Sequence, residues 1–195
     1  MFHVRQRYPL SILKKNMKKT LFFLAILFLV SVESTKANNS NYNNHIHIEA
    51  QKDSIRLVEL DRYWDAYVQA VKEGDFEGLK ALYHNDAVLV KAASVIQTSI
   101  PIDMALAEWK EGLDNTKKGK EIAEVEFRFS QRIGNETTAH ETGIFMFTTM
   151  NNKSKVKLKY PVHFEMLMIR GSDGWHALME HQKSDATQEE WDALN

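Results

Sequence analysis

The spacing of apolar residues changes once along this chain, and this change constrains the fold more than any other feature. Between Ile55 and Leu113, apolar residues recur mostly every three or four positions, as on the buried side of a helix. From Ala123 to Lys183 they alternate with polar residues, as on a strand. Helices followed by hairpin-linked strands are typical of an α+β domain with helices packed on one face of a curved antiparallel sheet.

The stretch from Ile55 to Val90 is predicted to hold a long helix, a short helix and a first strand. Gly74 suits a left-handed end to the long helix, and Asp75 is placed to accept backbone hydrogen bonds at the start of the next. Asn85-Asp86 then predicts a turn into a strand over residues 87–90. The long helix carries one buried stripe, formed by Leu57, Leu60, Trp64, Tyr67 and Val71.

A third helix is predicted after a short strand or hairpin around Val95 to Gln97. Thr98 or Ser99 is a candidate cap for this helix, with Pro101 in its first turn, where the missing N–H does no harm. Trp109 belongs to its predicted buried side.

Four strands are predicted in the second half of the chain, over about 123–129, 136–149, 156–168 and 175–183. Pro161 cannot donate a hydrogen bond within a sheet, so a bulge or an edge segment is expected there. A short helix is predicted from Thr187, with acidic residues in its first turn.

The N-terminal 37 residues are predicted to be a secretory signal peptide, which implies a secreted or periplasmic protein. A lysine-rich stretch precedes an apolar run from Leu21 to Val30, and Thr35-Lys36-Ala37 resembles a cleavage site. The alternative, a membrane anchor, is disfavoured because a spanning helix needs about 20 apolar residues. Met17 is an alternative start that still precedes a complete signal, and no stable membrane anchor is expected after cleavage.

Residues 38–52 are predicted to be a flexible polar leader, and residues 53–195 a single domain. His45 and His47 are spaced as a metal-binding pair could be, but the asparagine-rich composition favours a leader without function.

Charge and cysteine content exclude several classes of function. Without residues 1–37, which hold seven basic residues and one acidic, 18 basic and 25 acidic residues remain, a net charge of −7. This balance argues against nucleic acid as a partner, since phosphate binding needs a positive surface. The chain has no cysteine, so neither disulfides nor thiolate sites are available, and the exported domain must be stabilised by its core.

Several short motifs follow one another along the chain: Gly74-Asp75-Phe76, Leu82-Tyr83, Asp86-Ala87-Val88, Trp109, Asp173-Gly174-Trp175, His181 and Ser184. In this order they resemble the nuclear transport factor 2-like superfamily, and most closely its SnoaL-like branch, which is related to ketosteroid isomerases and contains many domains of unknown function. The resemblance covers about residues 53–186. It implies a cone in which a curved antiparallel sheet wraps around a long N-terminal helix and two shorter helices to enclose a pocket, commonly in a homodimer.

The sequence differs at one position from the steroid isomerases of the superfamily that it resembles. Those enzymes carry a general-base aspartate late in the first strand, where this chain has Lys91. A lysine is no equivalent base unless burial strongly lowers its pKa, so isomerase chemistry of that kind is not expected.

Candidate site residues come from strand alternation and from the aromatic residues of the helices. Trp175, Ala177, Met179 and His181 are predicted to share the apolar face of the last strand, with Glu180 and Gln182 on the other. His181 is therefore the candidate acid/base, and Tyr67 the candidate donor to an oxyanion. The full set of predicted ligand-binding residues is Tyr63, Trp64, Tyr67, Tyr83, His140, Trp175 and His181, although aromatic residues at helical spacing more often form core.

A zinc site built from His140, His163 and His181 is a sharper alternative, since three histidines can bind zinc and leave one position for water. Against it, strand parity places His163 on the lysine-bearing face of its strand and His181 on the apolar face of its own. We therefore predict no metal site and no cofactor.

These features predict an exported domain that binds a small, partly apolar molecule and forms a homodimer. An enzyme of the isomerase type with His181 as acid/base is the first alternative, and a dimeric interaction module with a vestigial pocket is the second.

Overall fold

The computed structural model describes residues 46, 48 and 50–194. The predicted signal peptide, the alternative start at Met17 and most of the predicted leader lie outside these residues. The chain divides into two units at residue 50, and the fold below is that of the second unit, residues 51–195. None of the helices in the described part is long and apolar enough to cross a membrane.

The long helix has the predicted buried stripe. As predicted, Gly74 and Asp75 separate it from the next helix. In the second unit a long helix runs through residues 51–73, so its first two residues belong to the predicted leader. The other described residues of the leader, 46, 48 and 50, are helical too. Gly74 ends the long helix with a φ of +67°, and the side chain of Asp75 accepts a hydrogen bond from the backbone N–H of Gly78 at the start of α2 (Phe76–Ala81). The other helices are α3 (Ile102–Lys117) and α4 (Gln188–Asp192), which begins with a capping box at the predicted residue, Thr187.

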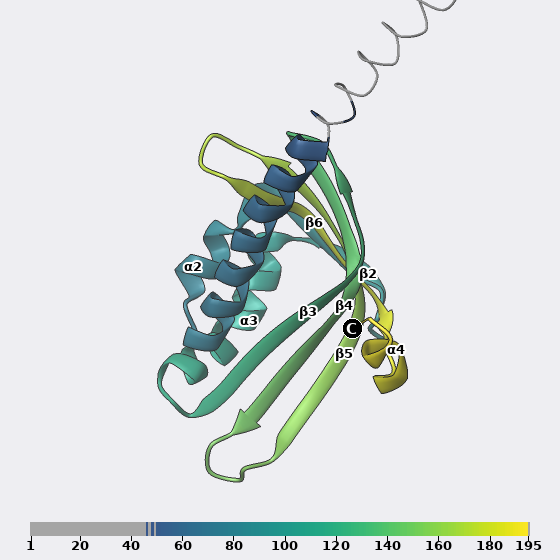
Figure 1. The fold of residues 1–195 in the computed structure, drawn as a ribbon. Helices are drawn as coiled ribbons and strands as arrows, with labels where there is room; N and C mark the ends of the chain where they lie inside the picture. Colours follow the sequence, from purple (N-terminus) through teal and green to yellow (C-terminus); the bar gives the residue numbers. More distant parts are fainter. Residues whose placement is uncertain (1–45, 47, 49, 195) are drawn as a thin grey trace, which may run out of the picture. The chain divides into compact units, whose positions relative to one another are not determined.

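Six strands form one curled, open sheet in the order β2-β1-β6-β5-β4-β3. The pairing of β1 with β6 is parallel and the others are antiparallel, so the sheet is mixed. The long helix, α2 and α3 lie on its inner side, whereas α4 lies against its outer side (Figure 1). The strands are β1 (Tyr83–Lys91), β2 (Thr98–Pro101), β3 (Glu121–Gly134), β4 (Thr138–Asn151), β5 (Lys157–Arg170) and β6 (Trp175–Asp185).

Apolar residues form a large core on the inner side and a small cluster on the outer side. The large core joins the stripe of the long helix to the inner faces of β3 to β6, including Leu60, Phe164 and Met168. The small cluster holds Trp191 of α4 against Ile144 and Met146 of β4. Both faces of β4 therefore carry buried residues, and the odd-numbered residues from Ala139 to Phe147 point to the inner side.

The boundaries between the helices and the first strands differ from the prediction. The strand predicted at Val95 to Gln97 lies at β2 instead, so Thr98 and Ser99 belong to a strand and do not cap α3. Pro101 occupies the cap position without a side-chain hydrogen bond. The predicted turn at Asn85-Asp86 is an irregular segment inside β1, where the register with β6 shifts between Tyr83 and Val88.

Pro161 lies in an edge segment, which is one of the two arrangements predicted. Residues 157–161 of β5 pair with β4 only, because pairing with β6 starts at Val162. The carbonyl of Pro161 accepts a hydrogen bond from the backbone N–H of Ala186 just beyond β6. The bulges of this region are in β6, where Leu178 and Lys183 have no opposite residue on β5.

Candidate ligand-binding site

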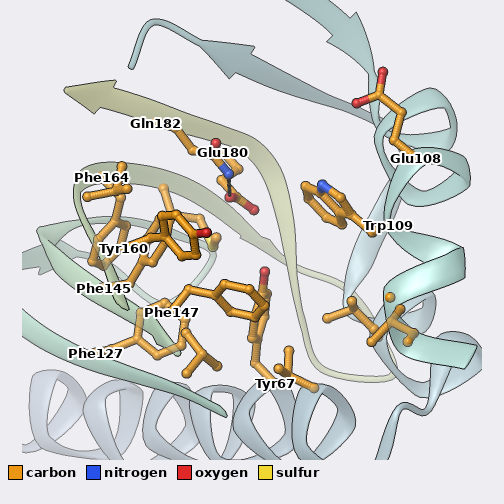
Figure 2. A pocket seen from close by; sticks show the side chains of 17 residues that line it. Tyr67, Glu108, Trp109, Phe127, Phe145, Phe147, Tyr160, Phe164, Glu180 and Gln182 are labelled. Carbon is orange, nitrogen blue, oxygen red and sulfur yellow. Dashed lines mark hydrogen bonds between the residues drawn. The ribbon is translucent and has the colours of Figure 1, made fainter. Parts of the chain in front are cut away.

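A cavity of about 420 Å³ lies between the inner face of the sheet, the long helix and α3. Most of its wall is aromatic or aliphatic. Phe127, Phe145, Phe147, Tyr160 and Phe164 line one side and Trp109 of α3 lines the opposite side (Figure 2). The polar residues of the wall are Tyr67, Glu108, Glu180 and Gln182. A cavity of this size, largely apolar with few polar groups, is typical of a small-molecule site.

Glu180 is the buried charged group of this wall. Its side chain comes from β6, and the residue is only 4% exposed. The Tyr83 hydroxyl donates to Glu180 Oε2 at 2.5 Å, and the Gln182 amide donates to Glu180 Oε1 at 2.8 Å. Figure 2 shows the Glu180 carboxylate in the space between Trp109 and the aromatic residues of the strands, with its hydrogen bond to Gln182.

The hydrogen bonds of Glu180 continue to the long helix through two tyrosines. The hydroxyls of Tyr67 and Tyr83 are 3.1 Å apart. A tyrosine hydroxyl has one hydrogen, and that of Tyr83 is used on Glu180, so Tyr67 must donate to Tyr83. The chain of donors therefore runs from Tyr67 through Tyr83 to the carboxylate, and the Tyr67 oxygen keeps lone pairs available on the cavity side.

Burial governs the protonation of these groups. Removal from water raises the pKa of the Glu180 carboxyl, and the hydrogen bonds from Tyr83 and Gln182 offset only part of this effect. Burial, reinforced by the nearby negative charge of Glu180, also raises the pKa of Tyr67 and of Tyr83, so both tyrosines stay neutral. The site thus holds a carboxyl whose proton affinity is increased, next to hydroxyls that do not ionise.

A bulge places Glu180 inside and His181 outside, which reverses the predicted facing. Trp175 and Ala177 point into the core as predicted, but Leu178 is an extra residue relative to β5 and shifts the alternation by one. Glu180 and Gln182 therefore line the cavity. His181 lies on the outer face, where its Nδ1 is 3.5 Å from Glu165.

Lys91, at the position of the isomerase aspartate, lies near the mouth of the cavity and forms an ion pair with Glu108 of α3. Glu108 is exposed and lines the cavity. Its charge is therefore compensated by Lys91, in contrast to that of Glu180.

The aromatic residues predicted to bind ligand have different positions. Tyr67 lines the cavity, and Tyr83 reaches it through Glu180. Trp64 belongs to the core instead, where its ring centroid is 4.4 Å from that of Phe127 and its indole donates to Glu141. Tyr63 is also in the core, with its hydroxyl 3.7 Å from the sulfur of Met166.

Trp175 lies away from the apolar cavity, beside a second, more polar depression. Its indole donates to Glu59 at 3.1 Å, and Arg170 contacts the same carboxylate. The other residues of this depression include Tyr63, Glu136 and His176. Trp175 thus joins the start of β6 to the long helix through Glu59.

The three histidines of the alternative zinc site do not form a cluster. His140, His163 and His181 all lie on the outer face, so the prediction that His163 and His181 point to opposite sides is wrong. His163 pairs with Glu190 of α4 at 3.3 Å, and His181 pairs with Glu165. Across the described ranges, no group of three or more histidine, aspartate or glutamate residues is arranged to hold a metal ion.

Sequence reasoning missed two buried carboxylates, and only one of them left a signal. Glu141 has the same parity as Ala139 and Gly143, so strand alternation alone predicts that it points inward; it is fully buried against Arg132 and Trp64. Glu180 left no such signal, because the bulge at Leu178 has no marker in the local sequence.

No family model matches the sequence, and no curated protein matches it. Solved structures do match. A conserved protein from Planctomyces limnophilus aligns with 14% identity and a TM-score of 0.54 over 64% of this chain and 91% of that chain. A protein of the nuclear transport factor 2-like family from Streptomyces avermitilis, which carries a provisional designation as a dehydratase, aligns with 16% identity and a TM-score of 0.51 over 66% and 95%.

The chain has the nuclear transport factor 2-like fold. A ketosteroid isomerase-like protein from Erwinia carotovora atroseptica supports the same conclusion, with 16% identity and a TM-score of 0.50 over 68% of this chain and 97% of that chain. The resemblance read from the sequence is thereby confirmed for the fold. Because this fold hosts many activities, the function has to be argued from the cavity.

Proposed function

We propose that this protein binds a small, predominantly apolar molecule in the cavity between the sheet and α3, with Glu180 as the polar group that orients it. The observation that carries the proposal is one buried carboxyl in a wall that is otherwise mostly aromatic or aliphatic. Apolar surface supplies affinity in such a site and a single polar group fixes orientation.

The neutral fluorescent dye N-phenylnaphthylamine tests this function. We expect saturable binding of one dye per chain with enhanced fluorescence. Val162→Trp, which adds a large ring to the cavity wall, should abolish the signal. Val88→Trp is the matched control, because Val88 lies on the opposite face of β1 from buried Ala87 and Leu89. Equal loss in both variants, with folding intact by circular dichroism, would contradict binding in this cavity.

A second candidate function is proton transfer with Glu180 as the acid/base group. It is favoured by the raised pKa of Glu180, since a carboxyl with increased proton affinity in an apolar cavity is suited to accept a proton from a weak carbon acid. This replaces the predicted role of His181, which lies on the outer face. Exchange of deuterium from solvent into a cavity-bound ketone, lost in Glu180→Gln, is the expected result.

We further propose that the protein is exported and pairs with a second copy of itself. Export rests on the sequence of residues 1–37, and the N-terminus of the protein recovered from an exporting host tests it. Pairing rests on the resemblance and on half-buried apolar residues such as Leu167 and Ile169 on the outer face of β5. Light scattering on the purified protein should give the mass of two chains, and the mass of one chain would contradict pairing.

A further inference from the structure

The charge of Glu180 is not compensated by any cation of the described part of the chain. Its hydrogen-bond partners are the neutral side chains of Tyr83 and Gln182. The nearby cations are engaged elsewhere, since Lys91 pairs with Glu108 at the cavity mouth and Lys183 pairs with Glu165 on the outer face. By contrast, the other fully buried carboxylate, Glu141, is paired with Arg132 at 2.7 Å.

An ionised carboxylate in an apolar cavity is costly unless a positive charge accompanies it. The groups beside Glu180 add to this preference. The Tyr67 and Tyr83 hydrogens both point along the chain toward the carboxylate, so the oxygens left for a ligand are acceptors. A ligand group that donates hydrogen bonds and carries positive charge is therefore complementary to this end of the cavity.

The rest of the wall also suits a cation with an apolar body. Aromatic rings attract cations through the negative charge of their faces, and the cavity is lined by rings from three strands and from α3 (Figure 2). Beyond residue 37, acidic residues outnumber basic ones by seven, which favours the approach of cations.

We propose that the ligand is an organic cation, a protonated amine on an apolar body, whose ammonium group pairs with Glu180. This rests on the proposed binding function and adds the chemical class of the ligand to it. The amine would pair with Glu180 in the way that Arg132 pairs with Glu141. It would donate to Glu180, with the Tyr67 oxygen as a second acceptor.

The amine, alcohol and carboxylate of adamantane test the proposal, because they share one apolar cage and differ in charge. Each is titrated into the full purified chain near neutral pH, by calorimetry and by displacement of N-phenylnaphthylamine. We expect the amine to bind at least about tenfold more tightly than the alcohol, and the carboxylate more weakly than either. Equal binding of amine and alcohol would overturn the proposal without touching the binding function.

Two variants localise the effect. Glu180→Gln should weaken amine binding by roughly 30-fold and alcohol binding by much less, because it removes the buried charge and keeps the approximate shape of the side chain. Glu108→Gln is the matched control, since Glu108 also lines the cavity but is exposed and paired with Lys91. A preference for amine that survives Glu180→Gln and disappears in Glu108→Gln would overturn the assignment. If neither the dye nor any adamantane compound binds the wild-type chain, the binding function itself is wrong, and the ligand class falls with it.

Discussion

The hydroxyl of Tyr83 lies 2.5 Å from Oε2 of Glu180 and joins the second residue after α2 to the middle of the last strand. The two residues are 97 positions apart in the sequence, and the parallel pairing of β1 with β6 brings them together. This hydrogen bond links the start of β1 to the protonation of the Glu180 carboxyl in the cavity. Its strength can be tested separately from ligand binding.

Tyr83→Phe should destabilise the protein by about 1–3 kcal/mol, because a buried carboxylate loses one of its two hydrogen-bond donors. Tyr67→Phe is the control, since it leaves the bond between Tyr83 and Glu180 intact and should cost about 0.5–1.5 kcal/mol. Urea unfolding at neutral pH measures both values. A larger cost for Tyr67→Phe would contradict the direction of the donor chain.

The stability of the wild type should depend on pH through Glu180. Its folded-state pKa is raised above the ordinary value of 4.5, so between these two values the folded chain holds a proton that the unfolded chain has released. The contribution to the free energy of unfolding is complete below 4.5 and is lost as pH rises through the folded-state pKa. Glu180→Gln lacks this loss.

The difference in thermal midpoint, variant minus wild type, should therefore become more positive as pH rises through that window. Comparing the two proteins cancels the contributions of the other carboxyl groups. A constant difference across the range would show that the pKa of Glu180 is not raised in the folded state.

His181→Ala should leave both stability and ligand binding nearly unchanged. His181 lies on the outer face beside Glu165, which Lys183 also contacts, and partly exposed ion pairs contribute about 0–1 kcal/mol. Dye titration and thermal unfolding check the two readouts. Loss of dye binding in His181→Ala, with an unchanged thermal midpoint, would restore the role predicted from the sequence.

Gly143→Ala should destabilise the pairing of β3 with β4 by about 1–3 kcal/mol. A β-carbon at Gly143 would lie 2.0 Å from the carbonyl oxygen of Arg128 and 2.9 Å from the α-carbon of Phe129, beside the register shift of β3. Gly112→Ala is the matched control, because nothing lies within 4 Å of its added carbon and alanine favours a helix. Urea unfolding should show a lower free energy of unfolding than wild type for Gly143→Ala and a higher one for Gly112→Ala.

Most of the fold could be predicted from the sequence because the spacing of apolar residues and the residues that cap helices act locally. The left-handed Gly74, the Asp75 cap and the helix starting after Thr187 depend on neighbouring residues, and each is confirmed. The stripe of the long helix is confirmed as well, with Leu57 half-buried and its other four residues buried. The start of α3 could not be predicted, because β2 takes Thr98 and Ser99 into the sheet through pairing with β1. That pairing depends on residues well upstream in the chain.

The candidate site was harder to predict for one physical reason. Strand alternation assigns faces only while each residue has one partner, and β6 violates this at Leu178. Tyr67 was found because a helical stripe is insensitive to such shifts. His181 was assigned to the cavity and Glu180 to the outside, which is the reverse of their observed facing.

The extra residue at Leu178 also has a consequence for how such a cavity can change during evolution. Deleting Leu178 would restore simple alternation through the middle of β6 without exchanging its two faces, because Glu180 would still pair with Met166 and His181 with Glu165. The Glu180 carboxyl would still face the cavity, and the His181 imidazole would stay on the surface that carries Glu165. The bulge can thus be lost with a single codon while the buried carboxyl keeps its place in the cavity wall.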